Sequence, residues 1–165
     1  MSKQRCAGWP KRCQLLDEEI TDANTDLAAL VARAAPALLA RFGVGTEVAG
    51  QLLITAGDNP GRLRSEASFA ALCGVSPLAA SSGRTHRHRL NRGGDRAANS
   101  ALHRVVIVRM RYDQATRAYV ERRTAQGLTK REIIRCLKRY VARELLPDIQ
   151  TAVPGPDTKP LPTAA

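Results

Sequence analysis

Apolar residues recur at helical spacing along most of the chain. The first such stretch carries Leu16, Ile20, Ala23, Leu27, Leu30 and Ala34. Steps of four and three residues place these side chains on one face of a helix. We expect a coiled-coil-like helix over residues 12–35, preceded by an unstructured segment at residues 1–11. Its apolar seam either packs within this chain, as a core helix or helical hairpin, or pairs with a second copy.

A glycine-rich turn separates the next two predicted helices. Pro36 begins a new element, and the helix from Thr46 to Ala56 has one apolar face. Between them, Gly43 and Gly45 permit a tight turn and a close approach to a ligand. The arrangement resembles a helix-hairpin-helix motif, in which the N-terminus of the second helix binds a phosphate. A plain glycine-rich connection is the alternative; under the first interpretation Gly43, Gly45 and Thr46 bind nucleic acid.

The remaining pattern predicts a short helix, a basic loop and three C-terminal helices. Ser65 can cap the short helix, and Gly74 ends it. Val75 to Gly94 is polar and loop-like. The last helices run from Asp95 to Tyr112, from Thr116 to Gln126, and from a Thr129–Glu132 capping box to the residue before Pro147. We therefore expect an all-α domain over residues 36–147 and a disordered Pro- and Thr-rich tail at residues 148–165.

The charge of the chain is strongly positive and unevenly distributed. The formal net charge is +11. From Arg84 to Glu144, 17 Lys and Arg stand against five Asp and Glu, a balance of +12, so the remainder is close to neutral. Fifteen of the 17 are Arg, whose planar guanidinium grips phosphate oxygens in pairs. Nucleic acid is the polyanion that such a surface most often binds.

One segment combines hydroxyl groups, a flexible glycine and clustered arginines. It contains Ser81, Ser82, Gly83, Arg84, Arg87, Arg89 and Arg92. Phosphoryl transfer needs a nucleophile and positive groups that offset the charge of the phosphate. The same residue types also suit a solvated loop or a passive phosphate clamp. The chemistry of the segment leaves these interpretations open.

Several short motifs occur in an order typical of one protein family. They are Gly43-Val44-Gly45, Gly57-Asp58 with Arg62, Phe69-Ala70-x-Leu72-x-Gly74-x-x-Pro77, Ser81-Ser82-Gly83 and Arg89-x-x-Arg92-Gly93. Together they resemble the C-terminal transposase domain of the IS110/IS116/IS902 insertion sequences, over roughly residues 12–147. The resemblance implies a DNA transposase (recombinase) of a mobile element, whose serine attacks a DNA phosphate and forms a covalent phosphoserine link.

The resemblance also assigns roles to individual residues. By position the nucleophile is Ser82, with Ser81 as the other possible register. The nearby Arg84, Arg87, Arg89 and Arg92 are implied ligands of DNA or RNA phosphates. His86 and His88 flank Arg87 without an acidic residue close by, so we expect no metal site there.

Partners and cofactors follow from the same resemblance. Full-length members carry an N-terminal RuvC-like domain with acidic metal ligands, and residues 1–11 show no such pattern. We expect a partial copy or one part of a split product, with no cofactor in this chain and Mg²⁺ only with the missing RuvC-like domain. The expected partners are DNA, a guide RNA, and either further copies of the chain or a separate RuvC-like domain.

The absence of a long apolar run predicts a cytoplasmic protein with no membrane partner. Two alternative functions remain open at this stage. The chain can be a helix-hairpin-helix protein that binds DNA without any chemistry, or one that binds RNA.

Overall fold

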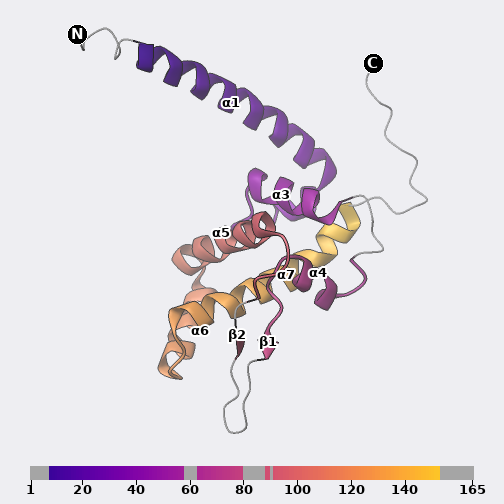
Figure 1. Cartoon of the computed structure of the whole chain (residues 1–165), viewed down its shortest axis with the longest axis vertical. Coiled ribbons are helices and arrows are strands. Elements are labelled where there is room, and N and C mark those ends of the chain that lie inside the picture. The colour runs from indigo at the N-terminus through magenta and orange to yellow at the C-terminus, as the bar shows by residue number, and fades with distance from the viewer. Residues whose placement is uncertain (1–7, 58–62, 80–87, 90, 153–165) are drawn as a thin grey trace.

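The computed structural model describes residues 8–57, 63–79, 88–89 and 91–152, and these residues form an all-α fold, as expected. In chain order the elements are α1 (Gly8–Ala34), α2 (Pro36–Leu39), α3 (Thr46–Ala56), α4 (Glu66–Leu72), β1 (Leu78–Ala79), β2 (His88–Arg89), α5 (Arg96–Tyr112), α6 (Gln114–Ala125) and α7 (Lys130–Ala152). Figure 1 shows α1 projecting from a body made of the other helices, with the two short strands on the body's far side.

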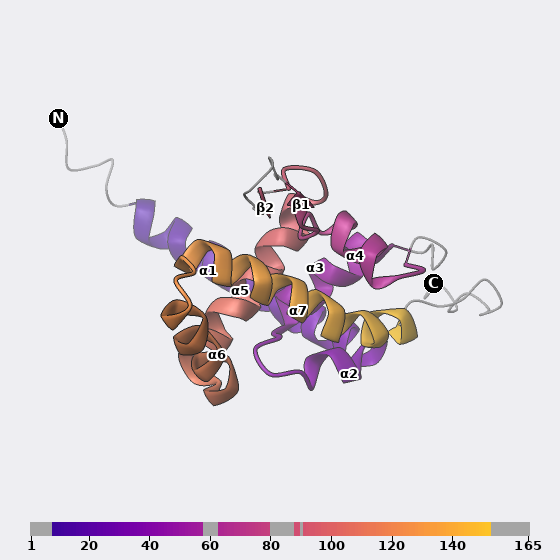
Figure 2. The ribbon, with the colours of Figure 1, turned by 90° about the horizontal axis from the view of Figure 1, so that it is seen from below.

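The body is built around α5 and α7. α5 packs against α3 on one side and α7 on another, and α4 lies against α7 (Figure 2). Leu52, Phe69, Leu102 and Leu145 come from four different helices and are fully buried. Aliphatic side chains supply most of this core, as the low aromatic content requires. Burial of each large side chain contributes about 1.5–3 kcal/mol to folding.

Only the C-terminal part of α1 contacts the body. Leu27 and Val31 pack on Gly50 of α3, where a Cβ atom would lie 3.3 Å from Leu27 Cδ1. Only the C-terminal part of the predicted apolar seam is therefore covered by the body, because Leu16 and Ile20 are 43% and 57% exposed. The face of α1 that packs in this chain includes Val31, which the predicted seam omitted.

Helix ends follow the predicted capping chemistry at three positions. The Ser65 hydroxyl accepts a hydrogen bond from the Ser68 N–H at 3.2 Å, and Asp95 caps α5. At the start of α7, the Thr129 N–H donates to Glu132 Oε2 at 2.9 Å. Each such cap satisfies N–H groups that the first helical turn leaves without partners.

Four predicted boundaries differ from the structure. The helix expected from residue 12 begins at Gly8. The one expected from Thr116 begins at Gln114, because Asp113 caps it by accepting a hydrogen bond from the Thr116 N–H. Val75–Gly94 is not entirely loop, since Leu78 pairs with Arg89 and Ala79 with His88 in an antiparallel ladder.

The fourth difference is at the end of α7, which was expected before Pro147 but continues to Ala152. A proline inside a helix costs about 3 kcal/mol. Tertiary contacts offset that cost: Ile149 is fully buried, and Asp148 accepts two hydrogen bonds from Arg41, at 2.6 and 3.1 Å. Residues 148–152 therefore belong to the folded body rather than to a tail.

Candidate nucleic-acid interface

The base of the β1–β2 hairpin is held closed by backbone contacts between glycines. Gly74 and Gly94 have φ angles of +64° and +86°, in the left-handed region that favours glycine. A Cβ atom on Gly74 would lie 2.4 Å from the Gly93 carbonyl oxygen, and one on Gly94 would lie 2.5 Å from the Gly74 nitrogen. Only glycines allow the two ends of the hairpin to meet this closely.

Asp95 fixes the same base to the helices. Its Oδ1 atom accepts hydrogen bonds from the N–H groups of Ala97 and Ala98 at 2.7 and 3.3 Å. The Thr55 hydroxyl of α3 donates to Oδ2 at 2.6 Å, and this bond is the main reason why the pKa of Asp95 lies below its ordinary value. The Asp95 N–H in turn donates to the Leu72 carbonyl at 2.7 Å.

A buried lysine lies behind the hairpin base. Lys138 of α7 is only 7% exposed, and its Nζ atom donates to Asn99 Oδ1 at 2.7 Å. The Asn99 amide donates onward to the carbonyls of Cys73 and Gly74, at 2.9 and 3.2 Å. Burial, and secondarily the charge of Arg135, lowers the pKa of Lys138. This chain of hydrogen bonds joins α7, α5 and the hairpin.

A cavity of about 500 Å³ opens between the hairpin base and α7. Its walls include residues 74–77, the strand β2, Asn91, and residues of α6 and α7. Five of its lining side chains are basic, and one is acidic: Arg89, Arg123, Arg135, Lys138, Arg139 and Glu132. An arrangement with this charge favours an anionic ligand.

The predicted arginines have different places in the structure. Arg89 lies in β2, is exposed, and lines the cavity. Arg92 is exposed in the segment that leads from the hairpin to α5. Arg84 and Arg87 lie outside the described residues.

The predicted nucleophile also lies outside the described part of the chain. Ser82, and Ser81 as its alternative register, fall between Ala79 and His88 in the sequence. The pairing of Ala79 with His88 thus joins the two ends of the serine-containing segment.

The glycine turn before α3 is at another place in the fold. Gly43 has a φ angle of +80° and packs on Val105, Val108 and Arg109, toward the C-terminal end of α5. Arg109 Nε donates to the Phe42 carbonyl at 2.9 Å, which holds the turn against α5. The hairpin base instead contacts Asn99, near the N-terminal end of α5.

The local geometry at the glycine turn contains elements of the predicted motif. Gly45 is the N-cap of α3 and carries no side chain that could cap it, and Thr46 is the first helical residue. The next residue, Glu47, is exposed and forms an ion pair with Arg104 at 2.6 Å. A carboxylate in this first turn competes with a phosphate for the positive end of the helix. Because the glycine turn and the hairpin base contact opposite ends of α5, the structure does not bring Gly43, Gly45 and Thr46 together with Arg89.

Sequence reasoning missed most of the cavity's basic residues. Arg135, Lys138 and Arg139 lie on α7, which carries none of the binding residues predicted from the sequence. Their spacing of three and four residues places them on adjoining positions of one helix face. That spacing was a readable signal, but it did not show that the face would meet the hairpin.

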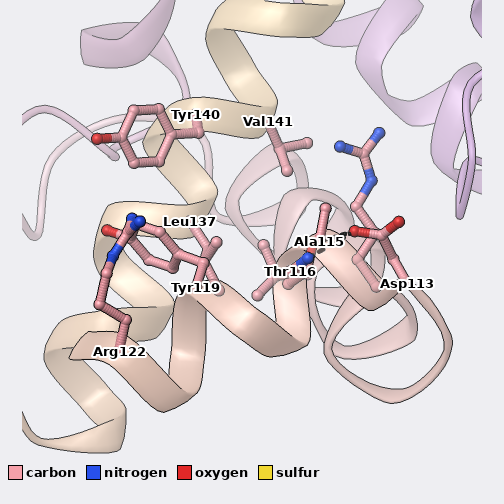
Figure 3. Close-up of a pocket in the computed structure, with 10 residues that line it drawn as sticks. Asp113, Ala115, Thr116, Tyr119, Arg122, Leu137, Tyr140 and Val141 are labelled. Atoms are coloured by element: carbon pink, nitrogen blue, oxygen red, sulfur yellow. Dashed lines mark hydrogen bonds between the residues drawn. The ribbon is translucent and has the colours of Figure 1, made fainter. Parts of the chain in front are cut away.

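A second hollow, of about 470 Å³, lies between α5, α6 and α7. Figure 3 shows Tyr140 on α7 beside Tyr119 and Arg122 on α6. The two rings meet edge to face with centroids 5.9 Å apart, and the Arg122 guanidinium lies 5.4 Å from the Tyr119 centroid. Burial is the main reason why the pKa of Tyr119 lies above its ordinary value.

Among the described residues, no group of three or more His, Cys, Asp or Glu is arranged to hold a metal ion. None of the helices in this part of the chain has the length and apolar character needed to cross a membrane.

A family model places the chain in a class of proteins described as transposases. It belongs to the IS116/IS110/IS902 family of transposases, because the model described as "Transposase IS116/IS110/IS902 family" matches residues 35–121. This match includes α2 to α5, the hairpin and most of α6. The expectation drawn from the sequence motifs is confirmed at the level of the family.

A relative from Streptomyces coelicolor supports the same assignment. The chain is 33% identical over 105 residues to the "Insertion element IS110 uncharacterized 43.6 kDa protein". The similarity covers 63% of this chain and 26% of the relative, so the chain matches about a quarter of that protein's length.

Proposed function

We propose that this chain is the C-terminal, nucleic-acid-binding part of an insertion-sequence transposase, with Ser82 as the nucleophile that attacks a DNA phosphodiester. The observation that supports the proposal best is the glycine-closed hairpin base beside a cationic cavity. Gly74 and Gly94 fix the base, and the serine-containing segment joins the two strands that rise from it. A reactive loop gains positional accuracy when a rigid scaffold holds both of its ends.

The proposed reaction exchanges one phosphodiester for another. The Ser82 oxygen forms a bond to phosphorus while the bond from phosphorus to one strand oxygen breaks. The hydroxyl proton of the serine is taken up, through solvent, by the departing strand oxygen, which leaves as a free hydroxyl. Attack by a different strand hydroxyl reverses these steps and joins new DNA. No atom is oxidised or reduced in either step.

The arginines supply electrostatic stabilisation in this proposal. Attack adds negative charge to the phosphate oxygens, and guanidinium groups offset that charge. Arg89 and Arg92 are exposed at the hairpin base, as this role requires. Arg84 and Arg87 are proposed to share the role because they lie within the same basic segment of the sequence.

A covalent-trapping experiment tests the serine. The chain is incubated with a labelled DNA that carries a nick or a junction, and products are resolved under denaturing conditions. We expect a labelled protein–DNA adduct that Ser82→Ala abolishes and Ser81→Ala retains, while both variants bind DNA as the unaltered chain does. Loss of the adduct only in Ser81→Ala would move the role to the other register.

Binding without any adduct would support the alternative function, a non-catalytic DNA- or RNA-binding protein. The basic cavity by itself is compatible with that alternative. Affinities for duplex DNA and for structured RNA, measured at the same salt concentration, distinguish a DNA-binding protein from an RNA-binding one. If six or more phosphates are contacted, affinity should fall by roughly three orders of magnitude between about 50 and 200 mM salt.

Self-association through α1 is part of the proposal. Leu16, Ile20 and Leu30 are 43%, 57% and 59% exposed and share one helix face. Apolar side chains on one face of a projecting helix favour pairing with a second helix, either from another copy or from a RuvC-like partner. Light scattering should give a mass above 17.9 kDa for the unaltered chain and a lower mass for Ile20→Asp. Equal masses would contradict pairing between copies through this seam.

A further inference from the structure

The ammonium group of Lys138 has hydrogen bonds left to make. An ammonium carries three donors. Its single hydrogen bond within the described residues goes to the amide oxygen of Asn99, and none of the ion pairs found there includes it. Asn99 is neutral, so it does not balance the charge. A buried charge without an opposite charge is costly, and a bound anion removes that cost.

The surroundings of Lys138 add positive charge instead of balancing it. Arg89, Arg135 and Arg139 line the same cavity. Arg135 Nη1 also donates to the His88 carbonyl at 3.3 Å, which holds this guanidinium close to β2. The acidic lining residue, Glu132, accepts hydrogen bonds from both the N–H and the hydroxyl of Thr129.

Arg123 also lines the cavity and adds to its positive charge. Its Nε atom is buried and has no hydrogen-bond partner among the described residues. The guanidinium is nevertheless held in place, because Nη1 donates to Gln126 at 2.8 Å and the group lies 5.9 Å from the Tyr119 ring centroid. Buried donors without partners are rare in folded proteins.

We propose that the cavity between the hairpin base and α7 binds one phosphate group of a nucleic-acid strand, with Lys138, Arg135 and Arg139 as its ligands. The volume of about 500 Å³ exceeds the space that a phosphate needs and is in the range of sites that hold a nucleotide. The cavity adjoins β2, which directly follows the serine-containing segment in the sequence. The inference rests on the proposed nucleic-acid-binding function and assigns one contact site within it.

Two matched pairs of variants on α7 test the site. Lys138→Met removes the buried ammonium, and Lys130→Met removes an exposed one from the start of the same helix, outside the cavity. Arg139→Gln and Arg131→Gln form the second pair, of which only Arg139 lines the cavity. Within each pair the change in net charge is identical, so a general electrostatic effect lowers the nucleic-acid affinity of both variants equally.

Binding is measured with a fluorescently labelled oligonucleotide by anisotropy, at several salt concentrations. We expect Lys138→Met and Arg139→Gln each to weaken binding by about tenfold or more, since each loses a charged hydrogen bond. The slope of log affinity against log salt should fall by about 1. Lys130→Met and Arg131→Gln should weaken binding less than about threefold. Thermal unfolding of each variant establishes that it is folded.

Inorganic phosphate is the second probe, because a free anion offers the same chemistry as a strand. If phosphate raises the unfolding temperature through Lys138 but oligonucleotide affinity is unchanged in Lys138→Met, the site takes a free anion and the strand assignment is wrong. If both cavity variants bind the oligonucleotide as their controls do, the site is refuted while DNA binding stands. If Lys138→Met weakens binding and no Ser82 adduct forms, the site holds and the serine proposal fails.

Discussion

Gly94 offers a sharp test of the idea that backbone contact closes the hairpin base. An alanine here would place its Cβ atom 2.5 Å from the Gly74 nitrogen, 2.6 Å from the Leu72 carbonyl oxygen and 2.7 Å from that of Ala71. All three neighbours are backbone atoms, so no side chain can move aside. The matched control is Gly127→Ala: Gly127 has a φ angle of +84°, close to the +86° of Gly94, but a Cβ atom there would meet nothing within 4 Å.

The expected free energies follow from these contacts. A left-handed φ costs an alanine about 1–2 kcal/mol, and this is the whole cost expected at Gly127. At Gly94 the overlap forces the two segments apart. That separation weakens the hydrogen bond from the Asp95 N–H to Leu72, worth about 1 kcal/mol, and disturbs the Asp95 cap, worth about 1 kcal/mol more. Gly94→Ala should therefore destabilise the protein by about 3–4 kcal/mol, against about 1–2 kcal/mol for Gly127→Ala.

Urea unfolding followed by far-UV circular dichroism measures both values, with the slope checked for two-state behaviour. Gly94→Ala should also bind DNA more weakly than Gly127→Ala, because only Gly94→Ala moves the hairpin relative to α7. If the two substitutions differ by less than about 0.5 kcal/mol in the free energy of unfolding, the hairpin base is not held by backbone contact and the reasoning is refuted.

Three further outcomes follow from the same structure. Asp95→Ala should destabilise the fold by about 1–3 kcal/mol in urea unfolding, since it removes the α5 cap and the partner of Thr55; an unchanged midpoint would contradict this. The pKa values of Asp95 and Asp113 are lowered in the folded state. Their contribution to stability is therefore complete above the ordinary pKa of 3.8 and is lost as the pH falls through the lower folded values. The urea midpoint, measured at a series of acid pH values, should fall progressively over this range. Burial raises the pKa of Cys73 to about 12, so an alkylating reagent followed by mass spectrometry should label exposed Cys13 quickly and Cys73 only on unfolding; equal rates would show that Cys73 is accessible.

The helices were largely predictable because the signals that specify them are local. Ser65, Asp95 and Thr129 act on N–H groups two or three residues away, so their capping roles can be read from sequence order. The boundaries that failed depended on distant residues. Pro147 was expected to end α7, but the contact of Asp148 with Arg41, more than a hundred positions earlier, continues the helix beyond it.

The candidate site was predictable only in part, for the same reason. The basic character of the hairpin region was visible in the sequence, and Arg89 does line the cavity. Lys138 is one of three basic residues at adjoining positions on α7, and only its burial beside Asn99 sets it apart from the other two. The glycine turn at Gly43 was predicted to bind nucleic acid, as the arginines were, yet it packs near the C-terminal end of α5, away from the hairpin base.

The sequence by itself determined the helical class, the caps, the position of the glycines and the strong positive charge from Arg84 onward, since each depends on residue type or on neighbours within one or two turns. Tertiary structure decided which charges share a cavity, which half of α1 is covered, and why Gly74 and Gly94 must lack side chains. These features join residues that lie from 20 positions apart, for Gly74 and Gly94, to 50 positions apart, for Arg89 and Arg139. Their contact arises only when α3, α5 and α7 bury their apolar faces against one another. Local periodicity does not specify how these helices pack together.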